Sequence, residues 1–128
     1  MFCGLSELYL SNLSLKERDS GPICELEFLE VLDISYNKFN TLYSFIFLKN
    51  LKHLDIGNNQ INDAEYLIYY FPYIEYVDLR GNPLSKVNNS IFNKIESVLI
   101  DNTVKRTRYL EYDKKDAPSP PKKLKREL

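Results

Sequence analysis

Residues 51–61 of the chain are LKHLDIGNNQI, and residues 74–84 are IEYVDLRGNPL, so the second segment begins 23 residues after the first. Both segments carry apolar residues at positions one, four, six and eleven and an asparagine at position nine. Positions four and six point the same way from a short strand, because side chains alternate along an extended chain. The asparagine stands where the chain leaves the strand, and its side chain can bond backbone groups from one unit to the next. The two segments therefore predict successive units of one repeating structure.

Two further units precede these segments. The second unit matches at every position, with Leu29, Leu32, Ile34, Asn37 and Phe39. The first unit begins at Leu5 and carries Leu13 where asparagine is expected, and such departures are common in the end unit of a solenoid. The starts at residues 5, 29, 51 and 74 give periods of 24, 22 and 23 residues. Such short periods leave room for only a short helix or 3₁₀ turn opposite each strand.

The longest of these connections, residues 62–70, is predicted to be a helix. Asn62 or Asp63 can cap its start, and Phe71-Pro72 ends it. After the fourth unit, Phe92 and Ile95 have helical spacing and lead into a strand over residues 98–100. We expect this cap to occupy residues 88–104 and to close a single domain of residues 1–104.

The last 24 residues differ from this body in charge. Residues 1–104 carry 8 Lys/Arg and 14 Asp/Glu, a net charge of −6, whereas residues 105–128 carry 9 and 4, a net charge of +5. Residues 105–116 are predicted to be a basic segment after the cap, with a short docked helix over residues 109–116. Residues 117–128, APSPPKKLKREL, have little apolar surface to bury, so we expect a disordered basic tail.

The basic residues after the cap have three possible roles. They are Lys105, Arg106, Arg108, Lys122, Lys123, Lys125 and Arg126. The double proline before the last four keeps that cluster extended, as a nuclear import signal requires. The same cations can bind RNA phosphates by counterion release, or they can simply keep the protein soluble.

The four units resemble leucine-rich repeats of the template L-x-x-L-x-L-x-x-N-x-L. The closing sequences DLRGNPL (78–84) and VLIDNTV (98–104) are similar to those of a short-repeat class. That class includes the nuclear regulatory subunit of protein phosphatase 1, the A-prime protein of the branch-site-recognising spliceosomal snRNP, and the acidic leucine-rich nuclear phosphoproteins. The resemblance implies an α/β solenoid with a parallel sheet on the concave side, short helices or 3₁₀ turns on the convex side, and a C-terminal cap.

Several other classes of protein fit the sequence poorly. Cys3 and Cys24 lie neither in a CxxC motif nor beside other metal ligands, which argues against a disulfide scaffold or a zinc site. The N-terminus lacks the basic and apolar regions of a signal peptide, so we expect the protein not to be secreted. The longest aromatic-rich apolar run, residues 66–74, has nine residues and includes Pro72, too few to span a bilayer. We expect no metal, no other cofactor and no membrane contact.

The candidate functional residues are those predicted to point outward from the concave strands. They are Glu7, Tyr9, Ser11, Val31, Asp33, Ser35, His53, Asp55, Tyr76, Asp78 and Arg80. A catalytic role for the single histidine, His53, would need a nucleophile or a carboxylate partner. Asp33, Asp55 and Asp78 occupy the same place in successive strands, where three carboxylates can bind a cation or a basic partner. We favour a protein-binding surface over both a catalytic and a metal site.

The function that these features predict is non-catalytic protein recognition, because solenoids build extended binding surfaces. The resemblance favours a nuclear adaptor of the snRNP A-prime type, acting as a monomer within a larger complex with possible RNA contact through the basic C-terminal segment. One alternative is a regulatory subunit that binds an enzyme such as a protein phosphatase. Another is a histone or chromatin adaptor like the acidic nuclear phosphoproteins. We expect a nuclear location, or otherwise a cytoplasmic one.

Overall fold

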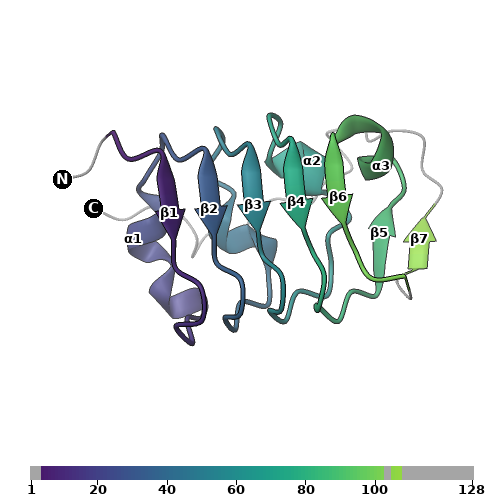
Figure 1. Cartoon of the computed structure of the whole chain (residues 1–128), viewed down its shortest axis with the longest axis horizontal. Coiled ribbons are helices and arrows are strands. Elements are labelled where there is room, and N and C mark those ends of the chain that lie inside the picture. The colour runs from purple at the N-terminus through teal and green to yellow at the C-terminus, as the bar shows by residue number, and fades with distance from the viewer. Residues whose placement is uncertain (1–3, 103–104, 108–128) are drawn as a thin grey trace.

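The computed structural model describes residues 4–102 and 105–107, which wind into successive coils (Figure 1). Each coil contributes one short strand to a five-stranded parallel sheet of order β1-β2-β3-β4-β6. The strands are β1 (Glu7–Tyr9), β2 (Val31–Asp33), β3 (His53–Asp55), β4 (Tyr76–Asp78) and β6 (Ser97–Leu99). The first four coincide with the four predicted repeat units, and β6 is the strand predicted for the cap.

The register of the sheet aligns equivalent positions of the repeat. Leu32 lies beside Leu54, and Leu54 lies beside Val77, so the fourth positions form one inward-facing row. All three side chains are fully buried, because alternation along each strand turns them toward the interior. The apolar positions that define the repeat in the sequence are therefore the positions that build the core.

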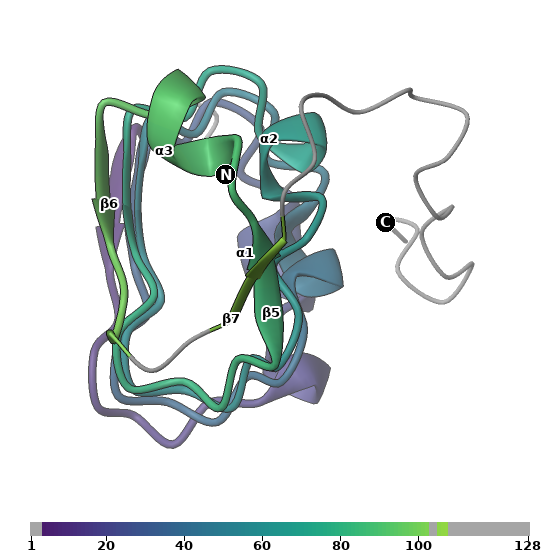
Figure 2. The same ribbon diagram turned by 90° about the vertical axis from the view of Figure 1, so that its right-hand side faces the viewer.

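Short helical segments lie across each coil from the sheet (Figure 2). They are η1 (Glu17–Asp19), α1 (Gly21–Cys24), η2 (Leu42–Phe45), α2 (Leu67–Tyr70) and α3 (Ile91–Lys94). Phe71 ends α2 as predicted, but the predicted start of that helix at residue 62 is wrong. The Asp63 carboxylate accepts the Glu65 backbone N–H at 2.9 Å, an Asx turn that competes with helix, and α2 begins only at Leu67.

A second, two-stranded sheet was not predicted. Strand β5 (Lys86–Asn88) pairs in parallel with β7 (Lys105–Thr107), on the helical side of the coil (Figure 2). The backbone at the start of the basic segment, including Lys105 and Arg106, thus continues the body past residue 104. Arg108 and the basic residues at 122, 123, 125 and 126 lie outside the described residues, as do the predicted helix over residues 109–116 and the tail.

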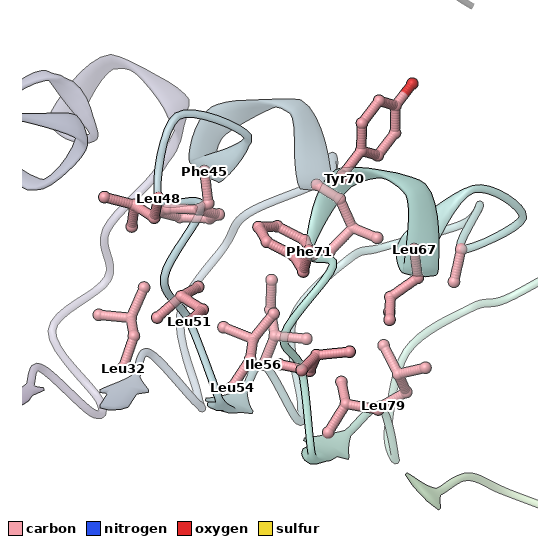
Figure 3. Close-up of a cluster of buried hydrophobic side chains, with 14 of the residues drawn as sticks. Leu32, Phe45, Leu48, Leu51, Leu54, Ile56, Leu67, Tyr70, Phe71 and Leu79 are labelled. Atoms are coloured by element: carbon pink, nitrogen blue, oxygen red, sulfur yellow. The ribbon is translucent and has the colours of Figure 1, made fainter. Parts of the chain in front are cut away.

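The core is one continuous cluster that runs through the coils (Figure 3). Leu54 and Ile56 of the third coil meet Leu67 and Phe71 from the helical side of the same coil, and all four are fully buried. Apolar side chains of the first coil are only partly buried because no described coil packs on their outer side. Burial is therefore deepest in the middle coils.

Three asparagines form the predicted ladder between coils. Asn59 accepts the Phe39 backbone N–H at 3.0 Å and donates to the carbonyl oxygens of Ile34 and Ile56 at 3.0 and 3.1 Å. Asn37 and Asn82 make equivalent bonds to the coils that precede them. All three side chains are buried, so each satisfies backbone groups that have no strand or helix partner.

The residue before each ladder asparagine has a left-handed backbone, with φ of 56° at Tyr36 and Asn58 and 76° at Gly81. A side chain at Gly81 would also meet the Asn58 side chain. We therefore expect Gly81→Ala to lower the free energy of unfolding by about 1–2 kcal/mol or more in urea titrations. Gly21→Ala is the matched control, because nothing lies within 4 Å of the added carbon. Equal losses in both variants would contradict the assigned turn.

Candidate functional site

The face of the five-stranded sheet that points away from the core is called the concave face here. Two rows of side chains cross it. The register aligns Glu7, Val31, His53, Tyr76 and Ser97 in one row. It aligns Tyr9, Asp33, Asp55, Asp78 and Leu99 in the other. Eight of the predicted binding residues therefore lie in these two rows, whereas Ser11, Ser35 and Arg80 come two residues after the ends of β1, β2 and β4.

An aromatic pair lies in the middle of the first row. The rings of His53 and Tyr76 stack with centroids 4.1 Å apart and planes 23° apart. Both side chains are half-buried, and Val31 continues the row on β2. His53 therefore packs against Tyr76, with Val31 beside it, on the outward face of the sheet, where the alternation of the strand predicted it.

The aspartate row has a structural role that the sequence did not reveal. The carboxylates of Asp33, Asp55 and Asp78 each accept the backbone N–H two residues further on, at 3.0 Å in every coil. These bonds shape the turn that follows each strand, as an Asx turn does. Aspartate at this position is thus explained partly by the turn and not by binding alone.

Two predicted contact residues prove to be buried. Asp78 is 6% exposed and its carboxylate is held by the Arg80 guanidinium at 2.8 and 3.1 Å. Ser35 is 7% exposed and donates its hydroxyl to Asp33 at 2.7 Å. The sequence predicted that the concave strands present both side chains, but contacts with Arg80 and Asp33 leave little of either exposed. The carboxylates of Asp33 and Asp55 remain half-exposed.

Tyr9 and Glu7 lie at the free end of the two rows, on β1. The Tyr9 hydroxyl donates to the Glu7 carboxylate at 2.9 Å, and the Tyr9 side chain is 61% exposed. This hydrogen bond is the main cause that raises the pKa of Tyr9. A large exposed aromatic at the end of an acidic row is a suitable contact residue.

A shallow groove runs along the edge of the concave face where the strands begin. It is lined by Glu30, Val31, Lys52, His53, Glu75, Tyr76, Glu96 and Ser97. The four charged residues each precede a strand by one position, and sequence reasoning missed all of them. The signal that could have found three of them is the second position of the repeat, which is Glu30, Lys52 and Glu75 in successive units, whereas Glu96 lies in the cap outside the repeat pattern.

The charges of the groove are only partly balanced. Lys52 lies 3.6 Å from Glu30, and both side chains are about half exposed. Glu75 and Glu96 are exposed farther along the groove. Such exposed pairs contribute little to stability.

Burial raises the pKa of Asp55, and the nearby carboxylates of Asp78 and Asp33 add to the rise, whereas the Gly57 N–H and His53 oppose it. The folded chain therefore holds this proton to a higher pH than the unfolded chain. The stability that the protonated carboxyl contributes is fully present below the pKa of Asp55 in the unfolded chain. It is lost as the pH rises through the higher pKa of the folded chain.

We expect Asp55→Asn to unfold at the same or a higher temperature than wild type at pH 7. The amide oxygen can still accept the Gly57 N–H, and the repulsion is removed. At a pH below the ordinary aspartate range the difference should vanish, because wild-type Asp55 is then neutral as well. Thermal unfolding at both pH values measures this, and a variant less stable than wild type at pH 7 alone would contradict it.

Comparison with known proteins agrees with this geometry. A family model described as "Leucine rich repeat" matches residues 3–62. An internalin of Listeria monocytogenes superposes with a TM-score of 0.57 and 20% identity, over 81% of this chain and 30% of that one. Internalin C2 of the same organism gives 0.51 and 17%, over 78% and 64%. The fold is a leucine-rich-repeat solenoid.

Two curated relatives also match the chain. Chaoptin of Drosophila melanogaster is 28% identical over 112 residues, which are 84% of this chain and 8% of chaoptin. The mouse leucine-rich repeat and WD repeat-containing protein 1 is 34% identical over 89 residues, which are 68% of this chain and 14% of the relative. The chain thus spans only a small part of the length of either relative.

We also searched the described residues for metal sites, reactive thiols and membrane-spanning helices. Within residues 4–102 and 105–107, no group of three or more His, Cys, Asp or Glu residues is placed to hold a metal ion. Cys24 is a buried thiol whose sulfur donates to the Ser44 carbonyl oxygen. None of the helices described there is long and apolar enough to cross a membrane.

Proposed function

We propose that the chain is a non-catalytic protein-recognition scaffold that contacts its partner through the concave face. Leucine-rich repeats and this fold are typical of interaction modules without catalytic activity. The observation that carries the proposal is the aromatic pair of His53 and Tyr76, which is half-buried between the aspartate row and the charged residues of the groove. Aromatic anchors within a polar surround commonly dominate protein interfaces.

The finer proposal is an adaptor in a nuclear ribonucleoprotein. The sequences at 78–84 and 98–104 support it through their resemblance to the short-repeat class that includes the snRNP A-prime protein. The basic residues from Lys105 onward support RNA contact, because cations bind phosphates with release of counterions. A nuclear location follows from the same proposal and from the basic cluster at residues 122–126.

A second candidate is an adaptor for a basic partner such as a chromatin protein. The acidic concave face favours it, since Asp33, Asp55 and Glu75 attract a cationic surface. A regulatory subunit that binds an enzyme such as a phosphatase is the third candidate. The identity of the captured partner separates these three.

The test is affinity capture from nuclear and cytosolic extracts, followed by mass spectrometry. Tyr76→Ala removes one of the two half-buried rings of the aromatic pair and is expected to weaken capture of the partner at least about tenfold. Tyr73→Ala is the matched control, because Tyr73 is 63% exposed and lies three residues earlier, outside the strand. Circular dichroism should be unchanged in both variants.

The proteins retained decide between the candidates. Spliceosomal proteins would support the ribonucleoprotein adaptor, whereas histones or a phosphatase catalytic subunit would support the alternatives. Capture that is lost with Tyr73→Ala and kept with Tyr76→Ala would place the interface away from the concave face and contradict the proposal.

A further inference from the structure

We propose that the concave face binds a lysine- or arginine-bearing segment of a protein, with one cationic side chain laid along the His53–Tyr76 stack and its charge held by the flanking carboxylates. This inference rests on the proposed function and names the chemistry of the partner.

The charge on this face is strongly one-sided. Its acidic residues and those of the groove are Glu7, Glu30, Asp33, Asp55, Glu75, Asp78 and Glu96. Two of them are engaged by cations of the chain itself, Asp78 by Arg80 at 2.8 Å and Glu30 by Lys52 at 3.6 Å. The remaining carboxylates exceed in number the two cations, Lys52 and Arg80. A partner with positive charge is therefore complementary to this face, and a phosphate backbone is repelled.

The carboxylates lie on both sides of the aromatic strip. Asp55 stands two residues after His53 on the same face of β3, which places the two about 6–7 Å apart along the strand. Glu75 immediately precedes Tyr76 and lines the groove on the opposite side. Burial is the main cause that raises the pKa of Asp55, and the nearby carboxylates of Asp78 and Asp33 add to the rise.

The strip itself suits the stem of a long cationic side chain. Lysine and arginine lay their methylene groups on apolar surface and keep the charged end in polar surroundings. The stacked rings, continued by Val31, supply such a surface. A stem resting on the rings would bring its charged end within reach of Asp55 or Glu75.

The test uses the full chain and a fluorescein-labelled peptide of about ten residues that alternates lysine with serine, long enough to cross the five strands. Fluorescence anisotropy is expected to show binding that weakens as salt is raised. A peptide with glutamate in place of lysine should not bind. A third peptide replaces lysine with diaminopropionic acid, which keeps the charge and removes most of the stem, and we expect it to bind several-fold more weakly.

Variants of the chain locate the binding. Asp33→Asn/Asp55→Asn keeps both turn acceptors, removes two charges and is expected to weaken binding of the lysine peptide about tenfold. Glu25→Gln/Glu27→Gln also removes two negative charges, but beside α1, and should leave the affinity for the lysine peptide unchanged. Tyr76→Ala should weaken binding of the lysine peptide. It should also abolish the difference in affinity between the lysine peptide and the diaminopropionic acid peptide.

Three results would overturn the inference. They are equal affinity for lysine and glutamate peptides, equal loss in the two double variants, and equal affinity for the long and short cationic side chains in wild type. Each can be told apart from failure of the proposed function. A partner captured through Tyr76 but indifferent to Asp33→Asn/Asp55→Asn would keep the concave interface and reject a basic ligand.

Discussion

Replacing Asn59 with alanine is expected to lower the free energy of unfolding by about 3 kcal/mol, because several buried backbone groups lose their partner at once. The Phe39 N–H loses its acceptor, and the carbonyl oxygens of Ile34, Ile56 and Gly57 each lose a donor. The side chain is buried, so water cannot easily take its place. Urea unfolding followed by circular dichroism measures the change.

Asn62→Ala is the control for this experiment. Asn62 is exposed and lies in the same connection, so its loss should change stability by less than about 0.5 kcal/mol. If Asn59→Ala unfolds with the same midpoint as Asn62→Ala, the ladder between coils contributes nothing and the assigned repeat register is wrong.

Truncating Phe71 is expected to have the largest effect of any single change considered. The ring is fully buried between the helical side and the sheet of the third coil, so Phe71→Ala removes contacts and leaves a cavity (Figure 3). Such changes cost about 3–5 kcal/mol. Because each coil of a solenoid packs mainly on its neighbours, the loss should loosen adjacent coils as well.

Hydrogen exchange and urea titration together test this second expectation. Amides in β3 and β4 should exchange faster in Phe71→Ala, and the midpoint should fall. Tyr73→Ala, two residues later in the chain, removes an aromatic ring that is mostly exposed and should leave both measurements near wild type. Faster exchange confined to the amides of α2 would show that the coils do not stabilise one another.

The fold was predictable because its signal repeats. Each of Leu32, Leu54 and Val77 is a weak indication by itself, but their spacing fixes strand, register and inward face together. The pairing of β5 with β7 was not predictable from spacing, since it joins residues 86–88 to residues 105–107 outside the repeat pattern. The start of α2 was misjudged because Asp63 bonds its own turn instead of capping a helix.

The site was predicted in outline, and its details depended on contacts between coils. Alternation correctly placed His53 and Tyr76 on one face, yet their stacking requires the register of β3 against β4. The burial of Asp78 follows from Arg80 folding back on it, which no periodicity encodes. Glu75 and Glu96 were missed because they precede the strands, and only the groove shows that they belong to the same surface.

The most direct test of the concave interface places a photo-reactive amino acid at Glu75 or, in a second protein, at Glu25. Both glutamates are exposed, but Glu75 lines the groove of the concave face and Glu25 ends α1 on the opposite side. After irradiation in cell extract, mass spectrometry identifies the proteins joined at each position. The concave interface predicts a partner joined at position 75 and absent at position 25. A partner joined at position 25 and absent at position 75 would contradict it.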